Sequence, residues 1–190
     1  MKKIVGFIII SLVVISFAFP TFSAEKINVS GSTTVLPIMQ IVAEEFMDQN
    51  PEVDITVSGG GSGVGIAALI DKIADIAMSS RQIKAEELDK AVAKGLNIQE
   101  FEIAKDAITI IVSPANTKMN QIDSQTLKQI YTGAITSWKD LNGEDKPIVV
   151  ISRDTNSGTF EVFNEHILKK DHLAPAVLML ASNRAILDEV

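Results

Sequence analysis

One recurring pattern constrains the fold more than any other feature: a short apolar run ends in Ser, Thr or Gly residues and opens into a helical run. It occurs at "KINVSGSTTVLPI", at "VDITVSGGGSGVGIAALI" and at "PIVVISRDTNSGTF". Strands that alternate with helices in this way predict an α/β fold with a largely parallel sheet. In such a sheet the three polar corners lie at the carboxyl ends of the strands, where ligands bind.

The remaining pattern predicts two lobes. Strands are expected at residues 26–30, 53–58, 74–80, 106–113 and 147–152, and helices at 36–50, 66–73, 84–95, 124–133, 159–170 and from 183. Residues 136–143 predict a short helical turn. The β-branched run at 106–113 precedes a proline-containing polar break, so we expect it to cross from a first lobe at 25–112 to a second at 113–190. The last helical run stops at Val190, and we therefore expect an incomplete second lobe.

The first 24 residues have the order of a secretory signal peptide. Lys2 and Lys3 precede an apolar run at 4–19, and the small-residue stretch "PTFSA" follows. A membrane anchor is the alternative, but the run is shorter than the roughly 20 apolar residues of a span. The chain contains no cysteine to which a lipid could be attached. These features predict an exported, unlipidated, periplasmic protein.

Charge and composition exclude several functions. The formal net charge is −7, and it becomes −9 once Lys2 and Lys3 are removed with the leader. An acidic chain disfavours nucleic acid as a partner. Without cysteine, thiolate catalysis and cysteine-based metal sites are impossible, and His166 and His172 leave little room for histidine ligands. We therefore expect no metal and no cofactor.

The three corners suit an anion. Helix N-termini present unpaired N–H groups and a partial positive charge, and Ser and Thr add hydroxyl donors. The alternative for any single corner is an ordinary N-cap. Three such corners in one short chain, with Arg153 beside one of them, favour binding.

Two other functions are weakly supported. "GGGSGVG" lacks the last glycine of the dinucleotide pattern and the lysine of a P-loop. Ser157 lies outside any G-x-S-x-G elbow, and no adjacent base is evident, because His166 lies nine residues further along a helix. A secreted phosphoester hydrolase is thus the less favoured alternative, and we expect a protein that is not an enzyme.

Five motifs together resemble the phosphate-binding proteins of bacterial high-affinity phosphate ABC transporters. They are "VSGSTTVLPI", "SGGGSGVGIAALI", "ADIAMSSR", "IYTGAITSWKDLNG" and "ISRDTNSGTF", and the resemblance covers the chain from about Lys26 to its end. It implies a type II periplasmic-binding-protein fold, with two α/β lobes joined by crossing strands and an oxyanion in the cleft. It also implies a monomer that captures inorganic phosphate and delivers it to the membrane permease of an ABC transporter.

The resemblance also implies a ligand set. The phosphate-binding residues would be Ser32, Thr33, Thr34, Ser62, Ser80, Arg153, Ser157, Gly158 and Thr159. Arg153 would supply the full positive charge, because its fork matches two oxygens of a tetrahedral anion.

Two departures from the family pattern leave alternatives open. Some members have an aspartate at the position of Ser80, where it accepts the proton of monohydrogen phosphate and rejects sulfate. With serine there, the acceptor could be Asp154, Asp106 or a main-chain carbonyl, and sulfate or molybdate becomes an alternative ligand. Arg81 could touch the ligand or pair with a carboxylate. The second departure is length, since the family continues beyond "ILDEV" to finish the second lobe and return to the first.

Overall fold

The computed structural model describes residues 24–116, 118, 119 and 121–190. The predicted signal peptide lies outside the described residues, except for Ala24. Across the described residues, no helix combines the length and the apolar character needed to cross a bilayer.

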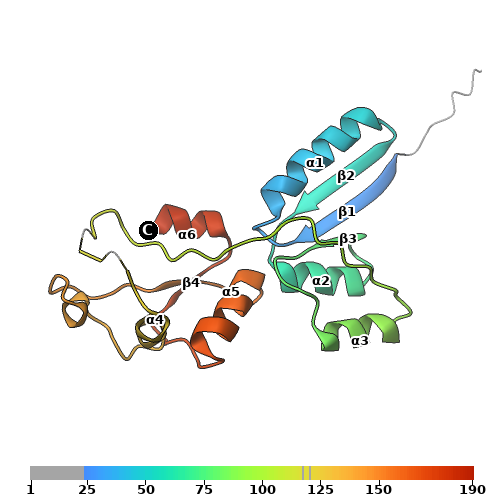
Figure 1. Ribbon diagram of the computed structural model, residues 1–190. Coiled ribbons are helices and arrows are strands. Elements are labelled where there is room, and N and C mark those ends of the chain that lie inside the picture. Colours follow the sequence, from blue (N-terminus) through green and yellow to red (C-terminus); the bar gives the residue numbers. More distant parts are fainter. Residues whose placement is uncertain (1–23, 117, 120) are drawn as a thin grey trace, which may run out of the picture.

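The first lobe is a parallel sheet with helices on both sides. In chain order its elements are β1 (Glu25–Gly31), α1 (Leu36–Gln49), β2 (Val53–Ser58), α2 (Ser62–Ile70), β3 (Ile76–Met78) and α3 (Ala85–Ala93). The strand order is β2-β1-β3, and both pairings are parallel. Figure 1 shows α1 on one side of this sheet and α2 with α3 on the other. The α/β class and the parallel sheet are as predicted.

Sequence patterns explain where these elements form. Alternate residues of β2 are half-buried and exposed, as expected for a strand with one covered face. Ile66 and Ile70 lie one helical turn apart in α2 and pack with Ala91 of α3 in a buried cluster. Ala77 of β3 packs against this cluster, which thus holds α2 between α3 and the sheet. The glycine loop (residues 59–65) leads into α2 and forms its N-terminus.

The second lobe is smaller. It contains α4 (Ser124–Tyr131), a 3₁₀ turn η1 (Trp138–Leu141), β4 (Ile151–Arg153), α5 (Gly158–Phe163), the π-helical turn η2 (Asn164–Leu168), β5 (Leu178–Leu180) and α6 (Asn183–Glu189). Strands β4 and β5 pair in parallel. Leu127, Phe163 and Leu168 form its buried core, and the Tyr131 and Phe163 rings lie 4.7 Å apart.

Three strand predictions need correction. Residues 106–113 do not form a strand, 74–80 shortens to Ile76–Met78, and 147–152 is replaced by the shorter strand Ile151–Arg153. Strand β5 was not predicted. A β-branched run becomes a strand only where a neighbour completes its hydrogen bonds. No strand among the described residues pairs with 106–113, and β5 offers β4 only three partners.

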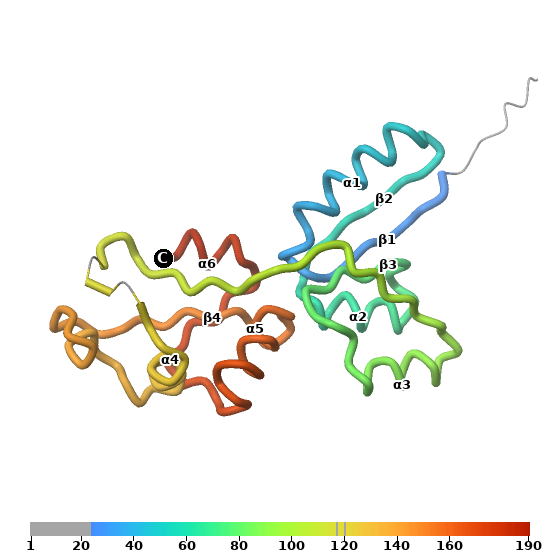
Figure 2. The backbone as a smooth tube through the Cα atoms, viewed as in Figure 1, coloured from blue at the N-terminus to red at the C-terminus, as the bar shows by residue number. Residues whose placement is uncertain are grey.

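The long connection between α3 and α4 links the lobes. Figure 2 shows it passing from the first-lobe elements to those of the second. Ile108, Ile110, Ile111 and Val112 on this segment are exposed. The predicted domain boundary between residues 112 and 113 falls within this connection and stays a prediction.

Candidate anion-binding site

The glycine loop of the first lobe meets the Ser157 corner of the second lobe. The Gly63 N–H donates to the carbonyl oxygen of Asn156 at 3.0 Å. A Cβ on Gly61 would lie 2.6 Å from that same oxygen, and the φ of Gly61 is +98°. A Cβ on Gly158 would lie 2.4 Å from Ser62 Oγ. The two corners therefore approach so closely that only glycine fits at both contacts.

Beside this contact, polar side chains of the two lobes face each other. Thr34 Oγ1 lies 3.4 Å from Thr159 Oγ1. The Asn183 amide donates from Nδ2 to Thr34 Oγ1 at 2.8 Å. Three segments therefore meet at one place: the corner at residues 32–34, the corner at residues 157–159 and the start of α6.

Arg153 lies at this meeting point and is 4% exposed. Its Nε and one terminal nitrogen donate to the carbonyl oxygens of Leu180 and Ala181 at 3.1 and 2.9 Å, and its other terminal nitrogen donates to Asn183 Oδ1. All three acceptors are neutral. The nearest recorded carboxylate, that of Asp154, is 3.9 Å away.

The electrostatic result is a buried cation with little compensation. Burial lowers the pKa of Arg153 below its ordinary value, and the charge of Asp154 opposes this only in part. A guanidinium has five N–H donors, of which the three recorded side-chain bonds use three. Both the charge and the remaining donors suit an anion.

Arg81 has the opposite surroundings. Its terminal nitrogens donate to both carboxylate oxygens of Glu87, each at 2.8 Å, and its Nε lies 2.6 Å from Glu161 Oε2. Burial alone would lower the pKa of Arg81, but the Glu87 hydrogen bonds and the charges of Glu161 and Glu87 raise it. Of the two readings left open by the sequence, the structure shows carboxylate pairing for Arg81.

Several predicted ligand hydroxyls already accept local hydrogen bonds. Ser32 Oγ accepts from the Thr34 and Val35 N–H groups at 3.2 and 3.4 Å. Ser157 Oγ accepts from the Phe160 N–H at 3.3 Å and caps α5. A hydroxyl that accepts still keeps its own proton to donate. The N-cap alternative and a ligand role are therefore compatible at these residues.

Ser62, Ser80 and Thr33 complete the predicted set. Ser62 Oγ accepts from the Ser80 N–H at 3.1 Å and lies 3.3 Å from Ser80 Oγ. Thr33 Oγ1 is buried and has no hydrogen-bond partner among the described residues. A buried hydroxyl without a partner costs free energy, so a ligand atom or a water at this position would stabilise it.

The carboxylates considered as proton acceptors are partly engaged. Asp154 Oδ1 accepts from the Asn156 N–H at 2.8 Å, and Asp106 Oδ1 accepts from the Ala107 N–H at 2.7 Å. A third carboxylate, that of Asp75, was not among these candidates and is also engaged: its Oδ2 accepts from the Asn28 N–H at 2.8 Å. Among the described residues, no three His, Cys, Asp or Glu side chains gather as a metal site would require.

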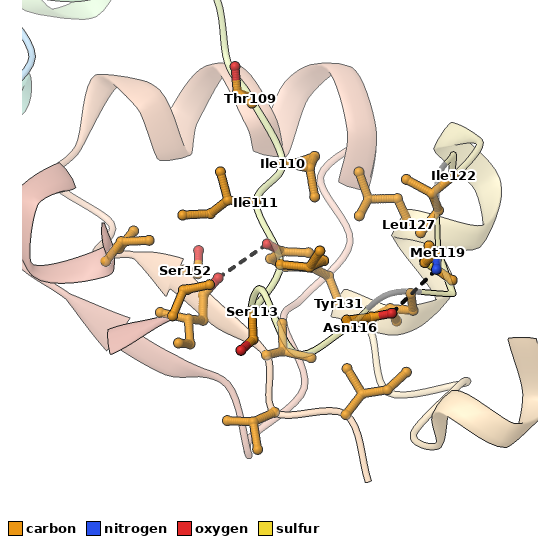
Figure 3. A pocket seen from close by; sticks show the side chains of 18 of the residues that line it. Thr109, Ile110, Ile111, Ser113, Asn116, Met119, Ile122, Leu127, Tyr131 and Ser152 are labelled. Carbon is orange, nitrogen blue, oxygen red and sulfur yellow. Dashed lines mark hydrogen bonds between the residues drawn. The ribbon is translucent and has the colours of Figure 1, made fainter. Parts of the chain in front are cut away.

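A cavity of about 910 Å³ opens beside the site. Thr34, Arg153, Thr159 and Asn183 line its polar part. Most of the lining is apolar, and Figure 3 shows Ile110, Ile111, Ile122 and Leu127 around it. The volume far exceeds that of a tetrahedral oxyanion, so only the polar part resembles an anion site.

Sequence reasoning missed Asn183 and Glu161. Asn183 follows "VLMLAS" and begins α6, which Ser182 caps by accepting from the Ala185 N–H at 3.0 Å. This is a fourth corner between a strand and a helix, and the rule that found the other three would have found it. Glu161 carries no comparable signal, because its partner Arg81 is distant in sequence.

Comparisons with known proteins place these features in a family. The model of a PBP superfamily domain matches residues 20–185. A phosphate ABC transporter substrate-binding protein of Clostridium perfringens, solved with bound phosphate, is 35% identical with a TM-score of 0.78. The match covers 87% of this chain and 66% of that one. An ABC-type phosphate transport receptor from Vibrio cholerae is 34% identical with a TM-score of 0.64, over 86% and 66% of the two chains.

Curated sequences agree with these structures. The phosphate-binding protein PstS of Staphylococcus aureus is 34% identical over 145 residues, which are 75% of this chain. The chain spans 44% of the length of that relative.

Proposed function

The chain belongs to the PBP superfamily, and from that premise we propose that it binds inorganic phosphate outside the cytoplasmic membrane and delivers it to an ABC transporter. The superfamily accounts for the α/β fold with parallel sheets. The ligand, the transporter and the location are the parts that we propose.

One observation carries the proposal: Arg153 is a buried cation, held by neutral acceptors, at the junction of the two lobes. A buried charge is costly unless a partner compensates it. An anion that enters between the lobes would supply that partner. Arg153 is the natural candidate because Arg81, the other arginine whose side chain is largely covered, is already paired with carboxylates.

The corners would supply the remaining contacts. The hydroxyls of Thr33, Thr34 and Thr159 and the N–H groups at the starts of α2 and α5 can donate to oxyanion oxygens in place of water. Fixed neutral dipoles of this kind allow an acidic protein to bind an anion. The full predicted set remains Ser32, Thr33, Thr34, Ser62, Ser80, Arg153, Ser157, Gly158 and Thr159.

The relatives support phosphate as the ligand. The Clostridium perfringens neighbour was solved with bound phosphate, and the Staphylococcus aureus relative is named a phosphate-binding protein. Both are named as binding proteins, so we propose a binding function without catalysis. A membrane permease as the partner, a monomeric state and a periplasmic location belong to the same proposal.

A second candidate is another tetrahedral oxyanion, sulfate in particular. Ser80 favours it, because a hydroxyl at that position would not repel a fully deprotonated anion as a carboxylate would. Ser80 Oγ lies 3.3 Å from Ser62 Oγ, and both can donate.

Calorimetric titration of residues 25–190 with phosphate, and separately with sulfate, tests the proposal. We expect saturable heat with phosphate and weaker binding of sulfate. Equal binding of both ions would favour the second candidate. No binding of either ion by a folded sample would refute both.

A further inference from the structure

We propose that Arg81 and Glu161 are positioning residues that hold the two lobes closed and thereby set how long the anion stays bound. Arg81 follows β3 in the first lobe, whereas Glu161 lies on α5 in the second. Their closest atoms, Nε and Oε2, are 2.6 Å apart. This inference rests on the proposed function for its ligand, but its effect on the lobes can be measured without one.

The pair is shielded from water. The Arg81 side chain is 7% exposed and that of Glu161 is 19% exposed. Exposed ion pairs contribute little to stability, whereas shielded charges interact more strongly and are costly when they lose their partner. Arg81 Nε and Glu161 Oε2 lack the alignment of a hydrogen bond, so the attraction between them is mainly that of their charges.

The first lobe prepares its half of the contact. The Glu87 carboxylate accepts hydrogen bonds from both terminal nitrogens of Arg81, and it also accepts from the Lys84 N–H at 2.9 Å. This fork leaves Nε of Arg81 directed towards the second lobe. Lys84 Nζ adds a second, more exposed contact to Glu161 Oε2 at 2.8 Å.

Opening of the lobes would remove ionic partners from Glu161 but would leave Arg81 with one. Arg81 would keep Glu87, because both belong to the first lobe. Glu161 would lose Arg81 and Lys84 together, and both its recorded ion pairs are to the first lobe. Separation of the lobes therefore removes both of these ionic partners from one carboxylate.

The pair is coupled to the predicted anion site through the chain itself. Arg81 directly follows Ser80, and Glu161 lies two residues after Thr159 on the same helix. Movement that brings Gly158 against Ser62 and Ser80 must also bring Glu161 towards Arg81. Because Arg81, Lys84, Glu87 and Glu161 sum to zero charge, the cluster closes the lobes without adding net charge beside Arg153.

The test compares Glu161→Gln with Glu165→Gln. Both substitutions remove one negative charge from the same helical stretch, but Glu165 is exposed. Because the chain has no cysteine, Asn97→Cys and Gln125→Cys, both at exposed positions in different lobes, allow paired spin labels to report the distance between the lobes. Stopped-flow kinetics with inorganic phosphate gives the two rate constants.

We expect Glu161→Gln to lengthen the distance between the lobes in ligand-free protein. With phosphate it should raise the dissociation rate about tenfold with little change in association, the usual result of breaking a shielded charge contact. In a protein that already carries Arg81→Gln, Glu161→Gln should change the dissociation rate and the lobe distance less, because the two residues act together. Glu165→Gln should match the wild type in both measurements.

Equal lobe distances in Glu161→Gln and Glu165→Gln would overturn the inference, and so would equal dissociation rates. If the wild type does not bind phosphate, the proposed function fails, but the distance measurement still decides the positioning role. A Glu161→Gln protein that does not fold would be replaced by Glu161→Asp. That variant keeps the carboxylate charge but shortens the side chain, and unchanged lobe distances in it would also overturn the inference.

Discussion

Arg81 and Arg153 both have little exposed side chain, but they differ in their partners. Arg81 contacts two carboxylates, whereas the side chain of Arg153 donates to neutral oxygens and lies 3.9 Å from Asp154. Burial penalises both cations, but only Arg81 has compensating charges close enough to raise its pKa. The uncompensated arginine is therefore the one suited to an external anion.

The sequence could identify Arg153 as a candidate because it lies at a polar corner after a strand. It could not decide the role of Arg81, because nothing in the local pattern singles out Glu87 among the neighbouring acidic residues, and the other partner, Glu161, comes from the second lobe. Pairing between residues so far apart depends on how the lobes meet, and local pattern does not contain that information. Asn183 was predictable in principle, since its corner resembles the other three.

Asn183→Asp tests the geometry around Arg153. The amide accepts from Arg153 and donates to Thr34, so a carboxylate would neutralise the cation and lose the donor. We expect phosphate affinity to fall by at least about tenfold, as for other changes to shielded charge contacts. Asn97→Asp, at an exposed position, is the matched control in calorimetry. Similar affinities for the two variants would contradict the assignment of Asn183.

The surroundings of Glu87 lead us to expect that the stability of the protein depends on pH. Burial by itself raises the pKa of Glu87, but the Arg81 hydrogen bonds, the Lys84 N–H and both positive charges outweigh it, so the net pKa is lowered. A group with a lowered folded-state pKa stabilises above its ordinary pKa and loses this contribution as the pH falls through the folded value. Arg81 and Lys84 face it as cations, and Glu161 adds a second carboxylate.

Thermal unfolding of the wild type and of Glu87→Gln across a range of pH measures the contribution of the Glu87 charge to stability. The wild type should be more stable near neutral pH, and the difference should disappear in acid. A difference that stays constant at every pH would show that the charge of Glu87 contributes nothing.

At the scale of elements, the corner between strand and helix is the unit of the site. Two of the corners have glycine where the lobes touch, namely Gly61 in the first lobe and Gly158 in the second. Gly158 begins α5, and any Cβ there would meet Ser62 Oγ and Ser80 Oγ. The sequence predicted this corner as a ligand contact but not its contact with the opposite lobe.

Gly158→Ala should therefore weaken phosphate binding by keeping the lobes apart. A Cβ 2.4 Å from Ser62 Oγ must displace it, whereas a helix start tolerates alanine. Gly63→Ala is the control, because its nearest contact would be an ordinary 3.4 Å. Calorimetry should show a loss of at least about tenfold only for Gly158→Ala, on the scale of overpacking costs. Equal affinities would argue against a closed junction at this corner.

The connecting segment shows why strand prediction failed. Residues 106–113 have strong β-propensity, yet a strand also needs a partner, which the described residues do not provide. We expect the amides of 106–113 to exchange hydrogen much faster than those of β1, which has a neighbour on each side. Mass spectrometry of exchanged peptides measures this. Protection equal to that of β1 would show that the segment is paired in solution.

At the scale of the whole molecule, the fold class followed from alternating strands and helices, but the closed arrangement did not. The sequence predicted two lobes because polar breaks separate two α/β patterns. Their contact depends on particular distant pairs, namely Gly63 with Asn156, Thr34 with Asn183 and Arg81 with Glu161. These pairs bring the candidate anion contacts of the two lobes together around Arg153.

The most direct test of this account is a calorimetric phosphate titration of Arg153→Gln. The amide can still donate to one of the carbonyl acceptors, but it carries no charge. Lys139→Gln, at an exposed ion pair with Asp145, removes the same charge from the surface and serves as the control. We predict that Arg153→Gln loses roughly a hundredfold or more in affinity, as for the loss of a charged hydrogen-bonding group, while Lys139→Gln binds like the wild type. A folded Arg153→Gln protein that binds phosphate as tightly as the wild type would contradict the account.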